Sequence, residues 1–203
     1  MGDWVLRTVL RQISDWHRET GNVCPVAIKV STRQLGCKMF RQQLIRHLKQ
    51  EQLPPEVIEI ELTETTVMHN PDAVLEELTA LHDMGVRISI DDFDGTGCSL
   101  DYLRRLPIDY VKIDKSFTQG IGVSHPDQNI IKVIVAIAKA MKMEVIAEGI
   151  ETETQAQFLQ ELGCDYGQGY LYSYPLKHAN MASKLRGYEK VTDLAKVRSI
   201  AAG

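Results

Sequence analysis

The sequence predicts an α/β fold built on a parallel sheet whose strands form part of a barrel. Short strands alternate strictly with helices along the chain, a pattern typical of parallel sheets. Within the strands apolar and polar residues alternate, whereas strands of an open doubly wound sheet read as continuous apolar runs. The polar residues gather near the carboxyl ends of the strands, where barrels build their active sites. We count about six strand–helix units, which is too few for a closed barrel of about eight.

The first half of the chain predicts three helices, each followed or preceded by a strand. Asp3 is expected to cap a first helix that ends at about His17, and Gly85 takes a C-cap position after the third helix. The predicted helices span about 3–17, 33–51 and 71–84. The predicted strands span about 24–30, 57–62 and 86–91.

The second half continues the alternation with shorter strands and a long helix that begins at Pro126. The predicted helices span about 100–105, 126–141, 152–162 and 178–187. The predicted strands span about 110–113, 144–147 and 165–167. The signals after Val191 are weaker and support one or two more helical turns at most. We therefore expect residues 1–203 to form a single domain.

Composition excludes several classes of function. The net charge of −4 and the absence of a basic tract argue against binding a nucleic acid polymer. No apolar run reaches the length of a transmembrane helix, and the N-terminus does not read as a signal peptide, so we expect a cytoplasmic protein without membrane insertion. The cysteines show no C-x-x-C spacing, which predicts reduced thiols and neither a zinc site nor a redox pair.

Two adjacent carboxylates end the central predicted strand. Residues 86–91 alternate between apolar and polar, so the strand has one face of each kind, and Asp91 and Asp92 lie at its end. Gly95 and Gly97 follow in a loop that can turn tightly. Two neighbouring carboxylates are costly unless a cation or a shared proton neutralises them. Taken alone, the pair also fits a solvated, aspartate-rich turn.

Carboxylates and a lysine recur at successive strand ends. These residues are Glu61, Asp91 with Asp92, Lys112 with Asp114, Glu148 with Glu151, and Gln168. Oxygen ligands without histidine or cysteine favour Mg²⁺ or Mn²⁺ over zinc. Two such ions that share a carboxylate suit in-line attack on a phosphodiester, and a lysine among them can orient the attacking water. Any one of these residues could instead be a salt-bridged barrel residue.

Several motifs carry a family resemblance across nearly the whole chain. They are ELTE at 61–64, DDF at 91–93, LDYLRRLPIDYVKID at 100–114, AEGIE at 147–151 and GCDYGQGYLYSYPL at 163–176. In this order they resemble the EAL family of cyclic di-GMP phosphodiesterases. The resemblance implies a TIM-like (β/α)₈ barrel, here incomplete, and a bacterial second-messenger function in signal transduction.

The resemblance also implies roles for individual residues. Glu61 and Asp91 would hold a first Mg²⁺ or Mn²⁺, and Asp91, Asp92 and Glu148 a second. Lys112 would position the attacking water and Glu151 would support the site, so that Lys112, Glu151 and Asp92 are the implied catalytic residues. The implied substrate-binding residues are Gln168, Arg33 and Asp114.

Three departures from the family pattern weaken the expected activity. The chain is expected to begin after the Glu-Ala-Leu motif, so that a first-metal glutamate and the first two strands are missing. Lys29 stands where the family's V-N-L-S motif has an asparagine ligand, since this sequence reads Ile28-Lys29-Val30-Ser31. The family's DDFGTGYSSL loop reads DDFDGTGCSL here, with Asp94 inserted. We therefore expect one metal position to be intact and the other impaired.

The sequence leaves three functions open. The first is metal-dependent hydrolysis of cyclic di-GMP to linear pGpG, expected to be weak or absent because two ligands of the first metal are lost. The second is a degenerate domain that binds cyclic di-GMP or a protein partner as a regulator, with a homodimer as a possible assembly. The third is a structural barrel without a nucleotide. For Lys29 we hypothesise that its ammonium replaces the first metal; the alternative is a lysine that points to solvent from an edge strand.

Overall fold

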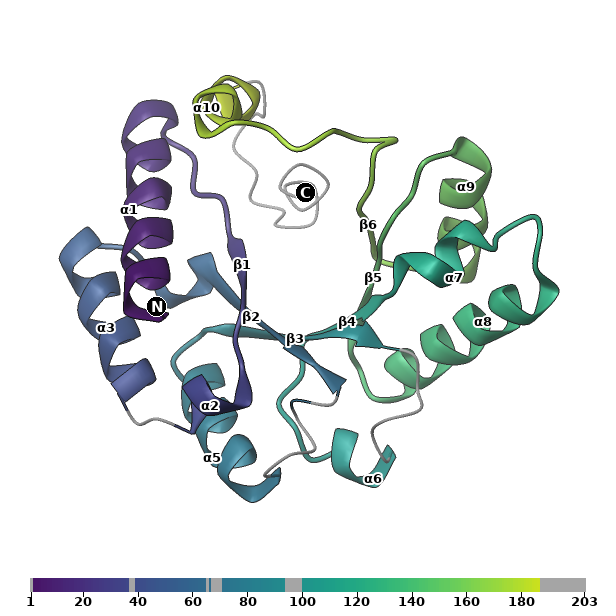
Figure 1. The fold of residues 1–203 in the computed structure, drawn as a ribbon, viewed down its shortest axis with the longest axis horizontal. Coiled ribbons are helices and arrows are strands. Elements are labelled where there is room, and N and C mark those ends of the chain that lie inside the picture. The colour runs from purple at the N-terminus through teal and green to yellow at the C-terminus, as the bar shows by residue number, and fades with distance from the viewer. Residues whose placement is uncertain (1, 37–38, 65, 67–70, 94–99, 187–203) are drawn as a thin grey trace.

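The computed structural model describes residues 2–36, 39–64, 66, 71–93 and 100–186. Its strands form one six-stranded sheet in the order β1-β2-β3-β4-β5-β6, and every neighbouring pair is parallel. The strands are β1 (Val26–Lys29), β2 (Ile58–Thr63), β3 (Arg87–Phe93), β4 (Tyr110–Ile113), β5 (Glu144–Ala147) and β6 (Tyr166–Gly167). Because spatial order equals sequence order, each crossover steps in the same direction. The sheet therefore curls into an open half-barrel (Figure 1).

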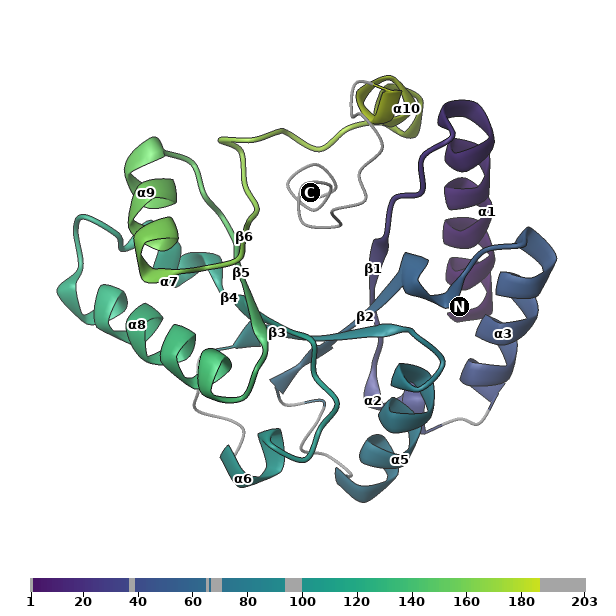
Figure 2. The same cartoon turned by 180° about the vertical axis from the view of Figure 1, so that it is seen from behind.

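Helices cover the convex side of the curled sheet (Figures 1 and 2). The described helices are α1 (Gly2–Thr20), α2 (Thr32–Leu35), α3 (Met39–Glu51), α5 (Pro71–His82), α6 (Leu100–Leu103), α7 (Lys115–Gln119), α8 (His125–Ala140), α9 (Glu153–Leu162) and α10 (His178–Arg186), with a 3₁₀ turn, η1 (Pro55–Val57). Of these, α10 lies at the open side of the sheet and not on its convex side. Among these described helices none is long and apolar enough to cross a membrane. The predicted alternation of strands and helices is confirmed.

The first helix corrects two details of the prediction. It ends at Thr20 rather than His17, because Gly21 adopts a φ of 74° and its N–H donates to the His17 carbonyl, which closes the C-terminus there. It begins at Gly2, so Asp3 lies in the first turn and is not the N-cap. Instead, Asp3 Oδ1 lies 2.8 Å from Nε2 of His47 on α3.

The predicted helix at 33–51 is two helices, α2 and α3. Gly36 follows α2 and is poorly suited to a helix interior, and residues 37–38 lie outside the described part of the chain. The sequence prediction also missed α7, which Asp114 caps by accepting a hydrogen bond from the Ser116 N–H at 2.9 Å. The predicted tail after Val191 and the predicted loop with Asp94, Gly95 and Gly97 fall outside the described residues.

Strand β2 buries both of its faces. In β2, Ile58, Ile60 and Leu62 pack into the apolar core with the surrounding helices, while Glu59 and Glu61 between them are also buried. Strand side chains alternate between the faces of a sheet, so the glutamates point to the concave side. The predicted polar inner face is therefore present, and its charges need partners.

A small satellite cluster connects the two ends of the described chain. Cys24, Met181 and Leu185 pack together with Trp16, and α10 lies against α1 (Figure 1). The amide of Asn22 donates to the Leu185 carbonyl at 2.8 Å. Between β1 and β6, which do not pair with each other in the described part of the chain, α10 spans the opening of the half-barrel (Figure 2).

Candidate functional site

Charged side chains converge at the carboxyl edge of the sheet. The parallel register places Lys29 beside Glu61 and Thr63 beside Asp91, and Glu148 directly follows β5. All strands of a parallel sheet end at the same edge, so residues from the ends of five strands, β1 to β5, meet there. The structure thus brings together Lys29, Glu61, Asp91, Asp92, Lys112 and Glu148, all of which the sequence had singled out.

Lys112 is the central cation of this cluster. Its Nζ lies 2.5 Å from Glu61 Oε1, 2.5 Å from Glu148 Oε1 and 3.5 Å from Asp91 Oδ1. Burial alone would lower the pKa of Lys112, but Glu61, Glu148 and Asp91 together raise it above its ordinary value. Lys112 is therefore an ammonium at neutral pH and acts as a hydrogen-bond donor, not as a base.

Asp91 is the most buried acid of the cluster, with 1% of its side chain exposed. Within the described residues neither carboxylate oxygen has a partner in hydrogen-bond geometry. Each faces an ammonium instead: Oδ2 lies 2.5 Å from Lys29 Nζ, and Oδ1 lies 3.5 Å from Lys112 Nζ. A buried carboxylate that is held only by cations is suited to bind a further cation.

A register slip lets two consecutive aspartates face the same site. The pairing of β3 with β4 shifts between Ile90 and Phe93, and Asp92 within this interval has a φ of 53°. In a regular strand, neighbours point to opposite faces. Here one oxygen each from Asp91, Asp92 and Glu148 lie within 4.8 Å of one another.

Two carboxyl groups of this triad, those of Asp92 and Glu148, have raised pKa values. Burial raises the pKa of Glu148 above its ordinary value, and Lys112 only partly opposes this. Burial and then the neighbouring charge of Asp91 raise the pKa of Asp92, against the effect of Lys29. Asp92 also faces Asp114, whose pKa is lowered despite its burial because Ser116 donates to it. The cluster therefore has more negative charge than its two lysines balance.

These properties fit a divalent cation on Asp91, Asp92 and Glu148. The donors are all carboxylate oxygens, as Mg²⁺ and Mn²⁺ prefer, and they include the buried carboxylate of Asp91, whose oxygens face ammonium groups. A cation there would stabilise the ionised forms of Asp92 and Glu148, whose pKa values are raised by burial and, to a smaller extent, by the neighbouring acids. Glu61, the other predicted metal ligand, is held by Lys112.

The other predicted site residues lie around the cluster. Gln168 follows β6; its N–H donates to the Ala147 carbonyl at 2.8 Å, and its carbonyl accepts from the Ile150 N–H at 2.9 Å. A Cβ on the next residue, Gly169, would lie 2.1 Å from the Ile150 carbonyl oxygen, so only glycine allows this close approach. The side chains of Glu151 and Arg33 are exposed, and their roles stay predictions.

The sequence did not predict two features of the site. The slip at Asp92 has no signal in the alternation of residues, because apolar and polar positions alternate regularly up to Asp91. Glu64 is buried just beyond β2. The site residues predicted from the ELTE motif include Glu61 but not Glu64. The spacing of its two glutamates was the available signal.

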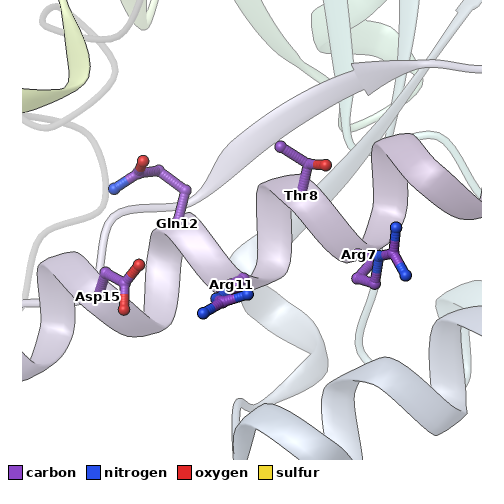
Figure 3. A pocket seen from close by; sticks show the side chains of 5 residues that line it. All are labelled: Arg7, Thr8, Arg11, Gln12 and Asp15. Atoms are coloured by element: carbon purple, nitrogen blue, oxygen red, sulfur yellow. The ribbon is translucent and has the colours of Figure 1, made fainter.

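A hollow of about 520 Å³ lies along α1, outside this cluster (Figure 3). Its lining residues Arg7, Thr8, Arg11, Gln12 and Asp15 all come from one helix. It contains none of the predicted site residues, and a single helix face does not build a site. The carboxyl edge of the sheet remains the candidate site.

With this geometry established, comparison with known proteins identifies the family. The family model described as EAL domain matches residues 1–175. The chain belongs to the EAL domain family. The curled parallel sheet agrees with this assignment, and the predicted fold class, an incomplete TIM-like barrel of the EAL type, is confirmed.

Curated relatives of this EAL domain are much longer proteins. Cyclic di-GMP phosphodiesterase NbdA of Pseudomonas aeruginosa is 40% identical over 189 residues, covering 93% of this chain and 24% of NbdA. Cyclic di-GMP phosphodiesterase PdeR of Escherichia coli is 35% identical over 180 residues, covering 87% of this chain and 26% of PdeR. The chain thus spans about a quarter of the length of these relatives.

Solved EAL domains have the same fold. The EAL domain of Mycobacterium smegmatis DcpA matches with a TM-score of 0.83 and 36% identity, covering 91% of this chain and 83% of that one. PaMucR phosphodiesterase in complex with c-di-GMP matches with a TM-score of 0.82 and 37% identity, covering 89% of this chain and 73% of that one.

Proposed function

We propose that this EAL domain binds cyclic di-GMP through a divalent ion on Asp91, Asp92 and Glu148, and hydrolyses it weakly or not at all. The observation that carries the proposal is the carboxylate triad at the strand ends, whose oxygens lie within 4.8 Å of one another. Relatives named as cyclic di-GMP phosphodiesterases and a relative in complex with c-di-GMP support the choice of ligand.

The ion and the lysines would contact the phosphates of the ligand. A divalent ion at the triad, Mg²⁺ or Mn²⁺, would withdraw charge from a phosphate oxygen and favour attack at phosphorus. Lys112 remains protonated, so it can hold a water or a phosphate oxygen by donating a hydrogen bond. Two hydrogen bonds fix the backbone of Gln168 at the neighbouring strand end, and its side chain would support the ligand.

The charge distribution supports slow hydrolysis. Lys112 engages Glu61 and Lys29 engages Asp91, so an ammonium group lies on both carboxylates that the resemblance assigns to the other ion. Glu61 is not part of the triad, and Asp91 is the only ligand that the two ions would share. Two-metal hydrolysis of a phosphodiester uses one ion on the attacking oxygen and one on the leaving oxygen. With one ion, the leaving oxygen would lack this stabilisation. Binding without turnover, as in a regulatory domain, is therefore the second candidate.

The test separates binding from turnover in one protein. Cyclic di-GMP is titrated by calorimetry in Ca²⁺, and formation of pGpG is followed by chromatography in Mg²⁺ or Mn²⁺. We expect binding that EDTA abolishes and that Asp91→Asn weakens by at least about tenfold, since each lost charge–cation contact contributes more than about 1.4 kcal/mol. Binding that is unchanged by both treatments would refute the metal-bridged site. Turnover at about 1 s⁻¹ or faster, in the ordinary range of enzymes, would refute the weak activity.

A further inference from the structure

We infer that Lys29 is a built-in cation that limits this carboxylate site to a single divalent ion. The inference rests on the metal site of the proposed function and adds a stoichiometry and the residue that sets it. It concerns how many ions the site accepts, and it can fail while the metal-dependent binding of cyclic di-GMP stands.

The contact of Lys29 with Asp91 is the first step of the argument. Lys29 ends the edge strand β1, and its Nζ reaches past β2 to within 2.5 Å of Asp91 Oδ2 on β3. The Asp91 side chain is almost fully buried, whereas 67% of the Lys29 side chain is exposed. The Lys29 side chain thus approaches from the solvent-exposed side, and its ammonium contacts the carboxylate of Asp91, which is otherwise buried.

The charge balance of the cluster is the second step. Glu61, Asp91, Asp92 and Glu148 supply four carboxylates, against which the ion pairs place two ammonium groups, Lys29 and Lys112. Two negative charges remain when every group is ionised, and one divalent ion balances them. A second divalent ion would leave this partly buried cluster with a net charge of +2, which is unfavourable. Without the Lys29 ammonium the net charge would be +1, so Lys29 raises the cost of the second ion.

Geometry assigns the exclusion to Lys29 and not to Lys112. Lys112 contacts three acids and is buried with them, so its removal would disturb the fold as well as the charge. Lys29 also feels Asp92 and Glu61 electrostatically, although its ion pair is with Asp91. Like charges near a shared ligand repel, so a second ion next to Asp91 would have to displace the Lys29 ammonium.

The decisive experiment counts Mn²⁺ ions bound to the whole chain. The free Mn²⁺ signal in electron paramagnetic resonance is measured during titration, and the count is checked by calorimetry. We expect one ion per chain for the unaltered protein. Lys29→Met should bind the first ion about tenfold more tightly, because one repelling charge is removed at short range, and should take up a second ion. Lys29→Arg keeps the charge and should behave like the unaltered protein.

Matched variants protect the result from trivial causes. Lys132→Met removes an exposed lysine of α8 and should change neither the count nor the affinity. Lys29→Gln is a second neutral variant if the methionine variant folds poorly. Two ions on the unaltered protein, or an unchanged first affinity in both neutral variants, would overturn the inference and leave the proposed function intact. Absence of Mn²⁺ binding in every protein would overturn the metal site itself.

Discussion

Lys112 determines whether the acids at the carboxyl edge can stay buried. It contacts Glu61 and Glu148 at 2.5 Å each, and 7% of its side chain is exposed. Buried ion pairs stabilise a fold little in total, but loss of one partner leaves an uncompensated charge. The cost of removing Lys112 should therefore exceed the net contribution of the pairs it forms.

Replacement of Lys112 tests this asymmetry. In metal-free buffer Lys112→Met should lower the free energy of unfolding by about 3 kcal/mol, because Glu61 and Glu148 lose their counter-ion. Urea denaturation followed by circular dichroism measures the change. Adding Glu61→Gln to this variant should restore part of the loss, since one uncompensated charge disappears. If the double variant is less stable than Lys112→Met by the full cost of a separate mutation, the two residues are not coupled.

At the scale of elements, the α1–α3 contact is secured by a polar clamp. His47 of α3 is buried, and its Nε2 lies 2.8 Å from Asp3 Oδ1 on α1. Arg46 donates to the same oxygen at 3.0 Å. The hydrogen bond with His47, followed by the charges of His47, Arg46 and Arg7, lowers the pKa of Asp3 below 3.8, and burial opposes them only in part. The clamp thus depends on an ionised Asp3.

The pH dependence of stability follows from this lowered pKa. A carboxyl group whose folded pKa is depressed stabilises the protein above its unfolded pKa and loses that effect as the pH falls through the folded value. Asp3→Asn should therefore lower the melting temperature at pH 7, and the difference from the unaltered protein should vanish in acid as the pH falls through the lowered pKa of Asp3. Thermal melts across this range measure it. Asp15→Asn, an exposed change on the same helix, is the control; a gap that persists in acid would contradict the linkage.

The elements also show what a sequence can and cannot specify. The strands were predictable from alternation and from nearby glycine and proline: at 110–113 and 144–147 prediction and structure agree, and the bounds of the other four strands differ by one or two residues at one or both ends. The break between α2 and α3 was missed because helical spacing continues across it. The cluster at the strand ends was foreseen from residue types, but its internal pairing was not. Lys112 pairs with Glu61 and Glu148 because the curved sheet brings the three side chains together. The local spacing of residues in the sequence does not contain this information.

For the whole molecule, the open sheet is the feature with the largest consequence. Among the described strands β1 pairs only with β2, and β6 only with β5. Unpaired edges expose backbone donors and acceptors that can pair with another chain. In the opening between them α10 contacts α1 by side chains and a few hydrogen bonds, which does not satisfy a strand edge.

We therefore predict that the isolated chain associates as its concentration rises. Sedimentation velocity across the micromolar range should show dimers or larger species whose share grows with concentration. Fusion of the additional N-terminal strands of a longer EAL domain should suppress this association by covering β1. A monodisperse, cooperatively unfolding monomer at every concentration would show that the edges are already protected.

The slip at Asp92 gives one residue two separate duties, with consequences for the tolerance of the site to change. Asp92 supplies a carboxylate oxygen and also adopts a φ of 53°, which aspartate and asparagine accept more readily than branched residues do. Asparagine at this position would keep the backbone path while removing the charge. Valine or isoleucine would oppose the path itself and turn the neighbouring Asp91 away from its partners. A single substitution at such a position can therefore abolish metal binding while the backbone of the site is retained. An inactive member of an enzyme family would then have the same fold as an active one.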